Sequence, residues 1–155
     1  MSEPKYVYEV FIKALPEEIW QGLTSADFTR QYFWKTAVES TWEKGAPVIY
    51  RGGADTPLVE GEILEADPPR KLSFTWRTLW TEELAKEPAS RVTFLIEPLG
   101  EVCRLRIVHD QFPEASQVYE DVSRGWSMIL CSLKTMIETG EPLPIAGNEQ
   151  EKIEC

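Results

Sequence analysis

The fold is decided by residues 116–139, SQVYEDVSRGWSMILCSLKTMIET. Apolar residues recur there every three or four positions, which predicts one long amphipathic helix. The apolar positions are Val118, Val122, Trp126, Ile129, Leu133 and Met136. Ser116 can cap the start of the helix, and Gly140 followed by Pro142 marks its end. At 1.5 Å per residue the helix would be about 36 Å long, enough to cross a small domain.

Gly125 interrupts this helix next to Trp126. A glycine inside a helix costs about 1 kcal/mol relative to alanine, so it needs a reason. Either another backbone packs closely against Gly125, or the missing side chain leaves room for something else. We favour close packing.

The preceding chain predicts a sheet for this helix to cover. Residues 5–13 form a strand, two short helices follow from Pro16 and Ser25, and a run of strands comes next. The later strands are expected at 35–41, 47–51, 58–66, 71–78, 91–97 and 103–110. They alternate apolar and polar residues, as an antiparallel sheet with one buried face does. Only the long helix is large enough to cover that face, so we expect an α+β fold with a curved antiparallel sheet wrapped around it.

Composition limits the classes of partner. The 155 residues suit a single domain, expected over 5–140 with an acidic flexible tail over 141–155. The net charge of -10 argues against binding to nucleic acid or to a membrane surface. The 3 cysteines are scattered and odd in number, which predicts neither a disulfide framework nor a metal site. With no signal-peptide pattern and no membrane-spanning apolar run, we expect a cytoplasmic protein.

Several short motifs, in order, resemble a known family. They are PEEIW at 16–20, FTRQYF at 28–33, GEILE at 61–65, DPPRKL at 67–72, SRVTF at 90–94 and the Gly125-Trp126 pair. Over about residues 5–140 the chain resembles the START-like, birch-pollen-allergen-like SRPBCC superfamily, and within it the branch related to the activator of heat shock protein 90 ATPase. The resemblance implies a helix-grip fold. One departure is Gln111, because relatives often carry glycine just before the phenylalanine.

The candidate ligand-binding residues lie on the face expected to be covered. They are Tyr50, Trp76, Phe94, His109, Phe112, Gly125, Trp126 and Leu130. The aromatic members either line an apolar pocket or form the core. His109, the only histidine, either meets a ligand as a polar or acid–base group, or is a structural residue bonded to a loop backbone, which we favour. We expect the adjacent Asp110 to face the opposite side.

The run Tyr32, Phe33 and Trp34 follows the short helices and either gates an entrance or anchors that helix pair. No phosphate loop, nucleophile elbow or metal-ligand cluster is visible, so we predict no catalytic residue, metal or cofactor. Three functions stay open. The first is non-catalytic binding of a small apolar ligand. The second is a co-chaperone-like interaction with a protein partner such as a chaperone, and the third is a cyclase- or hydrolase-like enzyme using His109.

Overall fold

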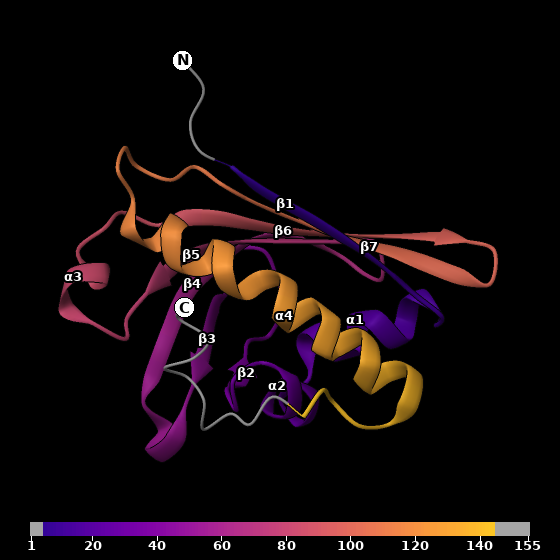
Figure 1. Ribbon diagram of the computed structural model, residues 1–155. Coiled ribbons are helices and arrows are strands. Elements are labelled where there is room, and N and C mark those ends of the chain that lie inside the picture. The colour runs from indigo at the N-terminus through magenta and orange to yellow at the C-terminus, as the bar shows by residue number, and fades with distance from the viewer. Residues whose placement is uncertain (1–4, 145–155) are drawn as a thin grey trace.

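A computed structural model describes residues 5–144 of the protein. Seven antiparallel strands form one sheet in the order β1-β7-β6-β5-β4-β3-β2 (Figure 1). The elements are β1 (Tyr6–Ile12), α1 (Pro16–Thr24), α2 (Ala26–Tyr32), β2 (Ala37–Glu39), β3 (Pro47–Arg51), a 3-10 turn (Gly53–Asp55), β4 (Pro57–Asp67), β5 (Lys71–Thr78), α3 (Glu82–Ala85), β6 (Ser90–Leu99), β7 (Val102–Asp110) and α4 (Gln117–Thr139). This architecture confirms the predicted α+β helix-grip fold.

The sheet has one buried and one solvent-exposed face because apolar and polar side chains alternate along its strands. On β5, Leu72, Phe74 and Trp76 are buried, whereas Arg77 is exposed. The register continues the apolar face across the sheet. Leu72 lies opposite Phe94 of β6, and Phe94 lies opposite Ile107 of β7, which is also buried. The curved sheet therefore presents a continuous apolar surface to α4.

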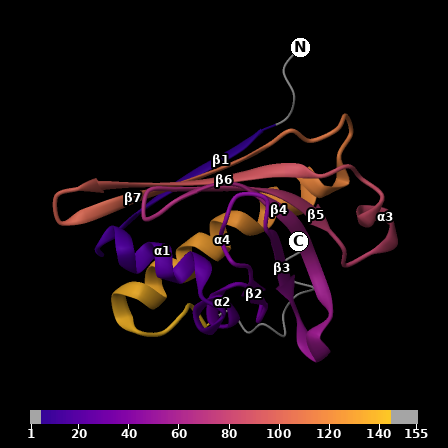
Figure 2. The ribbon, with the colours of Figure 1, turned by 180° about the vertical axis from the view of Figure 1, so that it is seen from behind.

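The long helix forms as one piece, as predicted. The Ser116 hydroxyl accepts a hydrogen bond from the backbone N–H of Tyr119, and Gly140 ends the helix with a φ of 93°. The Glu87 carboxylate, from the segment after α3, accepts from the Ser116 hydroxyl and from the backbone N–H of Gln117. The face of α4 toward the sheet is buried, and Figures 1 and 2 show the helix running across the concave side.

The two short helices close the lower side of the grip (Figure 2). The Tyr32 hydroxyl donates to the Gly22 carbonyl at 2.8 Å and so ties α2 to α1. Beyond α2 the chain turns through Trp34 and Lys35, whose φ values are 52° and 60°. Two consecutive non-glycine residues in the left-handed region are uncommon. Their turn shortens the strand predicted at 35–41 to β2.

Two local features concern the loops next to the sheet. Gln111, where relatives often have glycine, takes a φ of 67°, so the left-handed conformation is kept without glycine. The segment between β5 and β6 contains α3, whose Leu84 is buried. Most of the predicted tail, residues 145–155, lies outside the described residues. Within residues 5–144, no helix is long and apolar enough to cross a membrane.

Candidate functional site

Trp126 lies at the centre of an aromatic cluster between α4 and the sheet. Its ring centroid is 5.3 Å from that of Trp76 and 5.9 Å from that of Phe94. Phe33 meets it edge-on at 5.7 Å. A void of about 10 Å³ remains beside Trp76 and Trp126. That space holds one water molecule at most, so it is too small for an organic ligand in this conformation.

His109 is held in this cluster by side chains on both ring nitrogens. The Trp126 indole N–H donates to Nδ1 at 3.0 Å. An indole nitrogen can only donate, so Nδ1 is the acceptor and the ring proton lies on Nε2. Nε2 then donates to the Ser90 hydroxyl at 2.7 Å, and that hydroxyl donates to the Trp76 carbonyl at 3.4 Å. Each polar side-chain atom in this series of hydrogen bonds, from Trp126 through His109 to Ser90, has a partner.

Burial makes His109 a neutral residue. Its side chain is 0% exposed, and desolvation lowers its pKa from 6.5 to about 3. At neutral pH it is therefore not an imidazolium and cannot act as a general acid in that form, its single ring proton is donated to Ser90, and its one basic nitrogen is occupied by Trp126. The structural explanation favoured for His109 agrees with this geometry, although its partners are side chains and not a loop backbone. Asp110 faces away, as predicted, and pairs with Arg91 at 2.7 Å.

Gly125 is explained by a neighbouring side chain. A Cβ at this position would lie 2.8 Å from two ring carbons of Trp34. The close neighbour is thus an indole ring and not another backbone. Trp34 lines both the void beside Trp76 and Trp126 and the space next to α2, as does Ile129. Tyr32 anchors the helix pair, which is one of the two roles considered for the aromatic run, and gating of an entrance stays a prediction.

The structure brings most of the candidate residues together as a packed cluster. The ring centroids of Tyr50 and Phe33 are 4.8 Å apart, and those of His109 and Phe112 are 4.5 Å apart, with tilted rings in both pairs. Leu130 is buried on α4, one turn after Trp126. Only Trp76 and Trp126 among the candidates border the 10 Å³ void. Ligand binding by this set stays a prediction, for a state in which Trp34 has moved.

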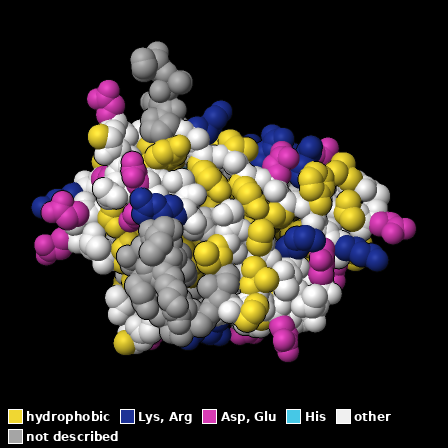
Figure 3. All heavy atoms as spheres, viewed as in Figure 1, with side chains coloured by type: hydrophobic (Ala, Val, Ile, Leu, Met, Phe, Trp, Pro, Cys, Tyr) yellow, Lys and Arg dark blue, Asp and Glu magenta, His cyan; other side chains and the backbone are white. Residues whose placement is uncertain are grey.

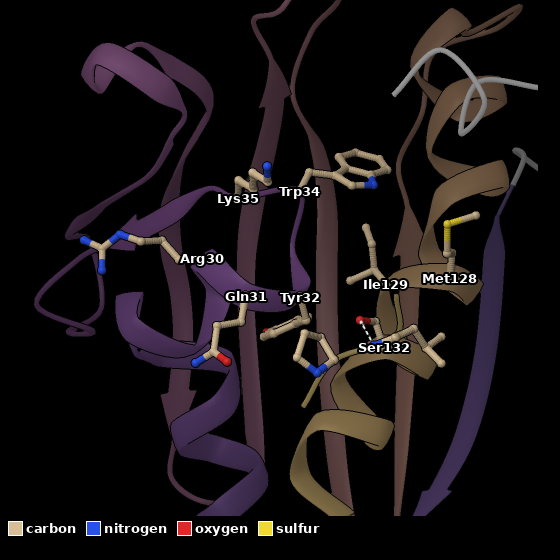
Figure 4. A pocket seen from close by; sticks show the side chains of 10 residues that line it. Arg30, Gln31, Tyr32, Trp34, Lys35, Met128, Ile129 and Ser132 are labelled. Atoms are coloured by element: carbon tan, nitrogen blue, oxygen red, sulfur yellow. Dashed lines mark hydrogen bonds between the residues drawn. The ribbon is translucent and has the colours of Figure 1, made fainter. Parts of the chain in front are cut away.

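A ligand-sized space lies on the flank of α4 that faces α2. The cavity measures about 310 Å³, at the lower end of the roughly 300–1,000 Å³ typical of small-molecule sites. Figure 4 shows it between α2 with the turn that follows, α4, and the chain after α4. Its lining residues are Arg30, Gln31, Tyr32, Trp34, Lys35, Met128, Ile129, Ser132, Pro142 and Leu143.

None of these ten lining residues belongs to the predicted ligand-binding set. Tyr32 and Trp34 were signalled by the aromatic run, and Arg30 and Gln31 lie in the FTRQYF motif, but no sequence pattern joins these residues to those of α4 and of the 142–143 segment. The 142–143 segment returns to α4 because the Leu143 backbone N–H donates to the Ser132 hydroxyl at 3.2 Å. That contact has no signature in the sequence. Within residues 5–144, no group of His, Cys, Asp and Glu residues could hold a metal ion.

Comparison with known proteins identifies the family. The sequence model described as "Activator of Hsp90 ATPase homolog 1-like protein" matches residues 13–138, which is most of the chain. The chain belongs to this family. The activator of Hsp90 ATPase homolog 1-like assignment agrees with the resemblance noted from the short motifs. No curated protein matches the chain.

Several solved structures are similar to this chain in fold. CalU16 from Micromonospora echinospora is 23% identical, with a TM-score of 0.72 over 97% of this chain and 81% of its own. The Aha1 dimer from Colwellia psychrerythraea is 20% identical, with a TM-score of 0.71 over 88% and 98%. An Hsp90 activator from Plasmodium falciparum is 18% identical, with a TM-score of 0.69 over 89% and 97%. At these identities the likeness concerns the fold alone.

Proposed function

We propose that the protein binds a small, mainly apolar ligand without transforming it, in the cavity between α2 and α4. The observation that carries the proposal is the contrast in volume, 310 Å³ in this cavity against 10 Å³ beside Trp126. Trp34, Met128 and Ile129 give the cavity apolar walls (Figure 4). Burying apolar surface there would supply about 25 cal/mol per Å² removed from water.

Trp34 also relates this cavity to the aromatic cluster. It lines both spaces together with Ile129, and it stands on a turn with two left-handed residues. A ligand that displaced the ring would reach Trp76 and Trp126. In this proposal the ligand stays in the cavity with the Trp34 ring in place, and the residues predicted from the sequence lie behind that ring.

The experiment is a binding titration with phenylnaphthylamine, a neutral fluorophore that brightens in apolar surroundings. The wild-type protein should bind it and be stabilised against heat. Met128→Trp places an indole in the cavity and should abolish the binding. Glu120→Trp adds the same ring to an exposed position of α4 outside the lining and should leave binding unchanged. No binding to the wild type, or equal binding to both variants, would refute the proposal.

A co-chaperone-like interaction is the second candidate. The family model bears the name of an Hsp90 activator, and a net charge of -10 suits a partner with a basic face. The discriminating measurement is the ATPase rate of purified Hsp90 with and without this protein. Stimulation would favour this candidate. An enzyme that uses His109 gains no support, because both ring nitrogens are engaged and the ring is buried.

A further inference from the structure

The charge of the cavity between α2 and α4 differs from that of the chain. The protein carries -10 overall, yet the residues lining this cavity include Arg30 and Lys35 and no carboxylate. Figure 3 shows acidic and basic side chains scattered over one face of the molecule. A cavity with only cations at its edge, in an acidic protein, favours a ligand with a negative charge.

Lys35 is the cation best placed to meet such a ligand. Its backbone is fixed next to Trp34 by the left-handed turn, and Figure 4 shows both side chains at the same edge of the cavity. Within residues 5–144, Lys35 has no ion-pair or hydrogen-bond partner. Arg30 instead pairs with Asp27 at 3.2 Å and extends away from α4 in Figure 4. Because Arg30 is paired, Lys35 is the lining cation available for direct contact with a ligand.

The opposite wall offers a polar donor and an apolar surface. Ser132 is 3% exposed, and its hydroxyl oxygen accepts from the Leu143 backbone N–H. The hydroxyl hydrogen has no acceptor among the described residues, so it is available to a ligand oxygen. Met128, Ile129 and Leu143 surround this group with apolar side chains.

Resting on the proposed function, we infer that the ligand is a small anionic amphiphile. Its acidic group would pair with Lys35 at the cavity edge, and its apolar body would lie against Trp34, Met128 and Ile129. A short aromatic or aliphatic acid has this chemistry. Lys35 then determines specificity for the charge of the ligand, while the apolar walls determine its size.

Two fluorophores with the same rings test this inference. Anilinonaphthalene sulfonate carries a sulfonate that phenylnaphthylamine lacks. The full-length protein should bind the sulfonate more tightly, and Lys35→Gln should weaken that binding about two- to fivefold, as expected for a partly exposed ion pair. The affinity for the neutral fluorophore should stay the same. Lys44→Gln removes an exposed lysine outside the cavity lining and should change neither affinity.

The outcomes separate the inference from the proposed function. If the neutral fluorophore binds and the sulfonate has no advantage, the inference is wrong and the apolar site stands. If Lys44→Gln weakens the sulfonate as much as Lys35→Gln does, the attraction is non-specific and the inference is also wrong. If the neutral fluorophore does not bind the wild type, the proposed function itself fails, and the inference fails with it.

Discussion

The two flanks of α4 differ in how completely they are packed. Toward the sheet, Trp126 is 1% exposed, surrounded by aromatic rings and hydrogen-bonded to His109. Toward α2, Met128 and Ser132 border a cavity of about 310 Å³. The comparison teaches that the most aromatic part of a helix-grip domain need not be the part with a ligand-sized space. Here the aromatic residues hold the fold together, and the available space lies beside them.

The largest expected effect is a difference in lost stability between a mutation on the sheet-facing flank and one on the cavity flank. Trp126→Ala should lower the free energy of unfolding by about 3–5 kcal/mol, because it leaves a large cavity and an unpaired His109 nitrogen. Met128→Ala, on the same helix but at the cavity, should cost about 1 kcal/mol or less. Urea denaturation of both variants measures the difference. Equal losses would mean that the two flanks are packed alike.

The next effect concerns pH and arises from His109. Its folded pKa of about 3 lies below its usual 6.5, so the unfolded chain binds the proton more readily. The stability from neutral His109 is fully present above pH 6.5 and is lost as the pH falls toward 3. The loss should reach about 1.4 kcal/mol per pH unit in that range.

His109→Gln removes the titrating group and should flatten this part of the stability profile. Carboxylates also titrate below pH 5, so the informative quantity is the difference between wild type and variant from pH 7 to pH 5. Denaturation curves at several pH values measure it. Parallel profiles for the two proteins would show that His109 is not buried in its neutral form.

A smaller effect tests the contact between Gly125 and the Trp34 ring. In the wild type, Gly125→Ala brings a methyl group to 2.8 Å from the Trp34 ring and should destabilise by about 1 kcal/mol. In a Trp34→Ala background the same change meets no ring. It should then stabilise by about 0.8–1.0 kcal/mol through helix propensity. Thermal melts of the four proteins in this cycle measure the reversal of sign, and the same sign in both backgrounds would exclude Trp34 as the neighbour.

The smallest effect is expected at the end of the chain. From composition, deletion of residues 145–155 should change the melting temperature by less than about 2 °C, since a loss of 1 kcal/mol would shift it by several degrees. Deletion of 141–155 also removes Pro142 and Leu143, which line the cavity. The longer deletion should therefore weaken phenylnaphthylamine binding, whereas the shorter should not. Equal binding by both would show that these two residues are dispensable.

The architecture could be predicted because it follows from periodicity. The helical spacing around Trp126 and the alternation on β5 each specify which face is buried, and one long helix is the only cover available for the sheet. The same alternation placed His109 inside and Asp110 outside, as observed.

The cavity could not be predicted because it depends on how separate segments meet. The turn at Trp34 and Lys35 is left-handed without glycine, so no sequence signal marked it. The return of Leu143 to Ser132 rests on one backbone hydrogen bond between residues that carry no motif. Gly125 marked a site of close approach, but its partner, a side chain 91 positions earlier in the sequence, could not be identified from spacing.

Nuclear magnetic resonance most directly tests the claim that ligands bind beside the aromatic cluster and not within it. In a titration with phenylnaphthylamine, the account predicts a large shift of the Met128 methyl signal and contacts between that methyl and the ligand. The Met136 methyl, buried and outside the cavity lining, and the Trp126 indole N–H should stay in place. A shift of the Trp126 indole with an unchanged Met128 methyl would contradict the account and place the ligand inside the grip.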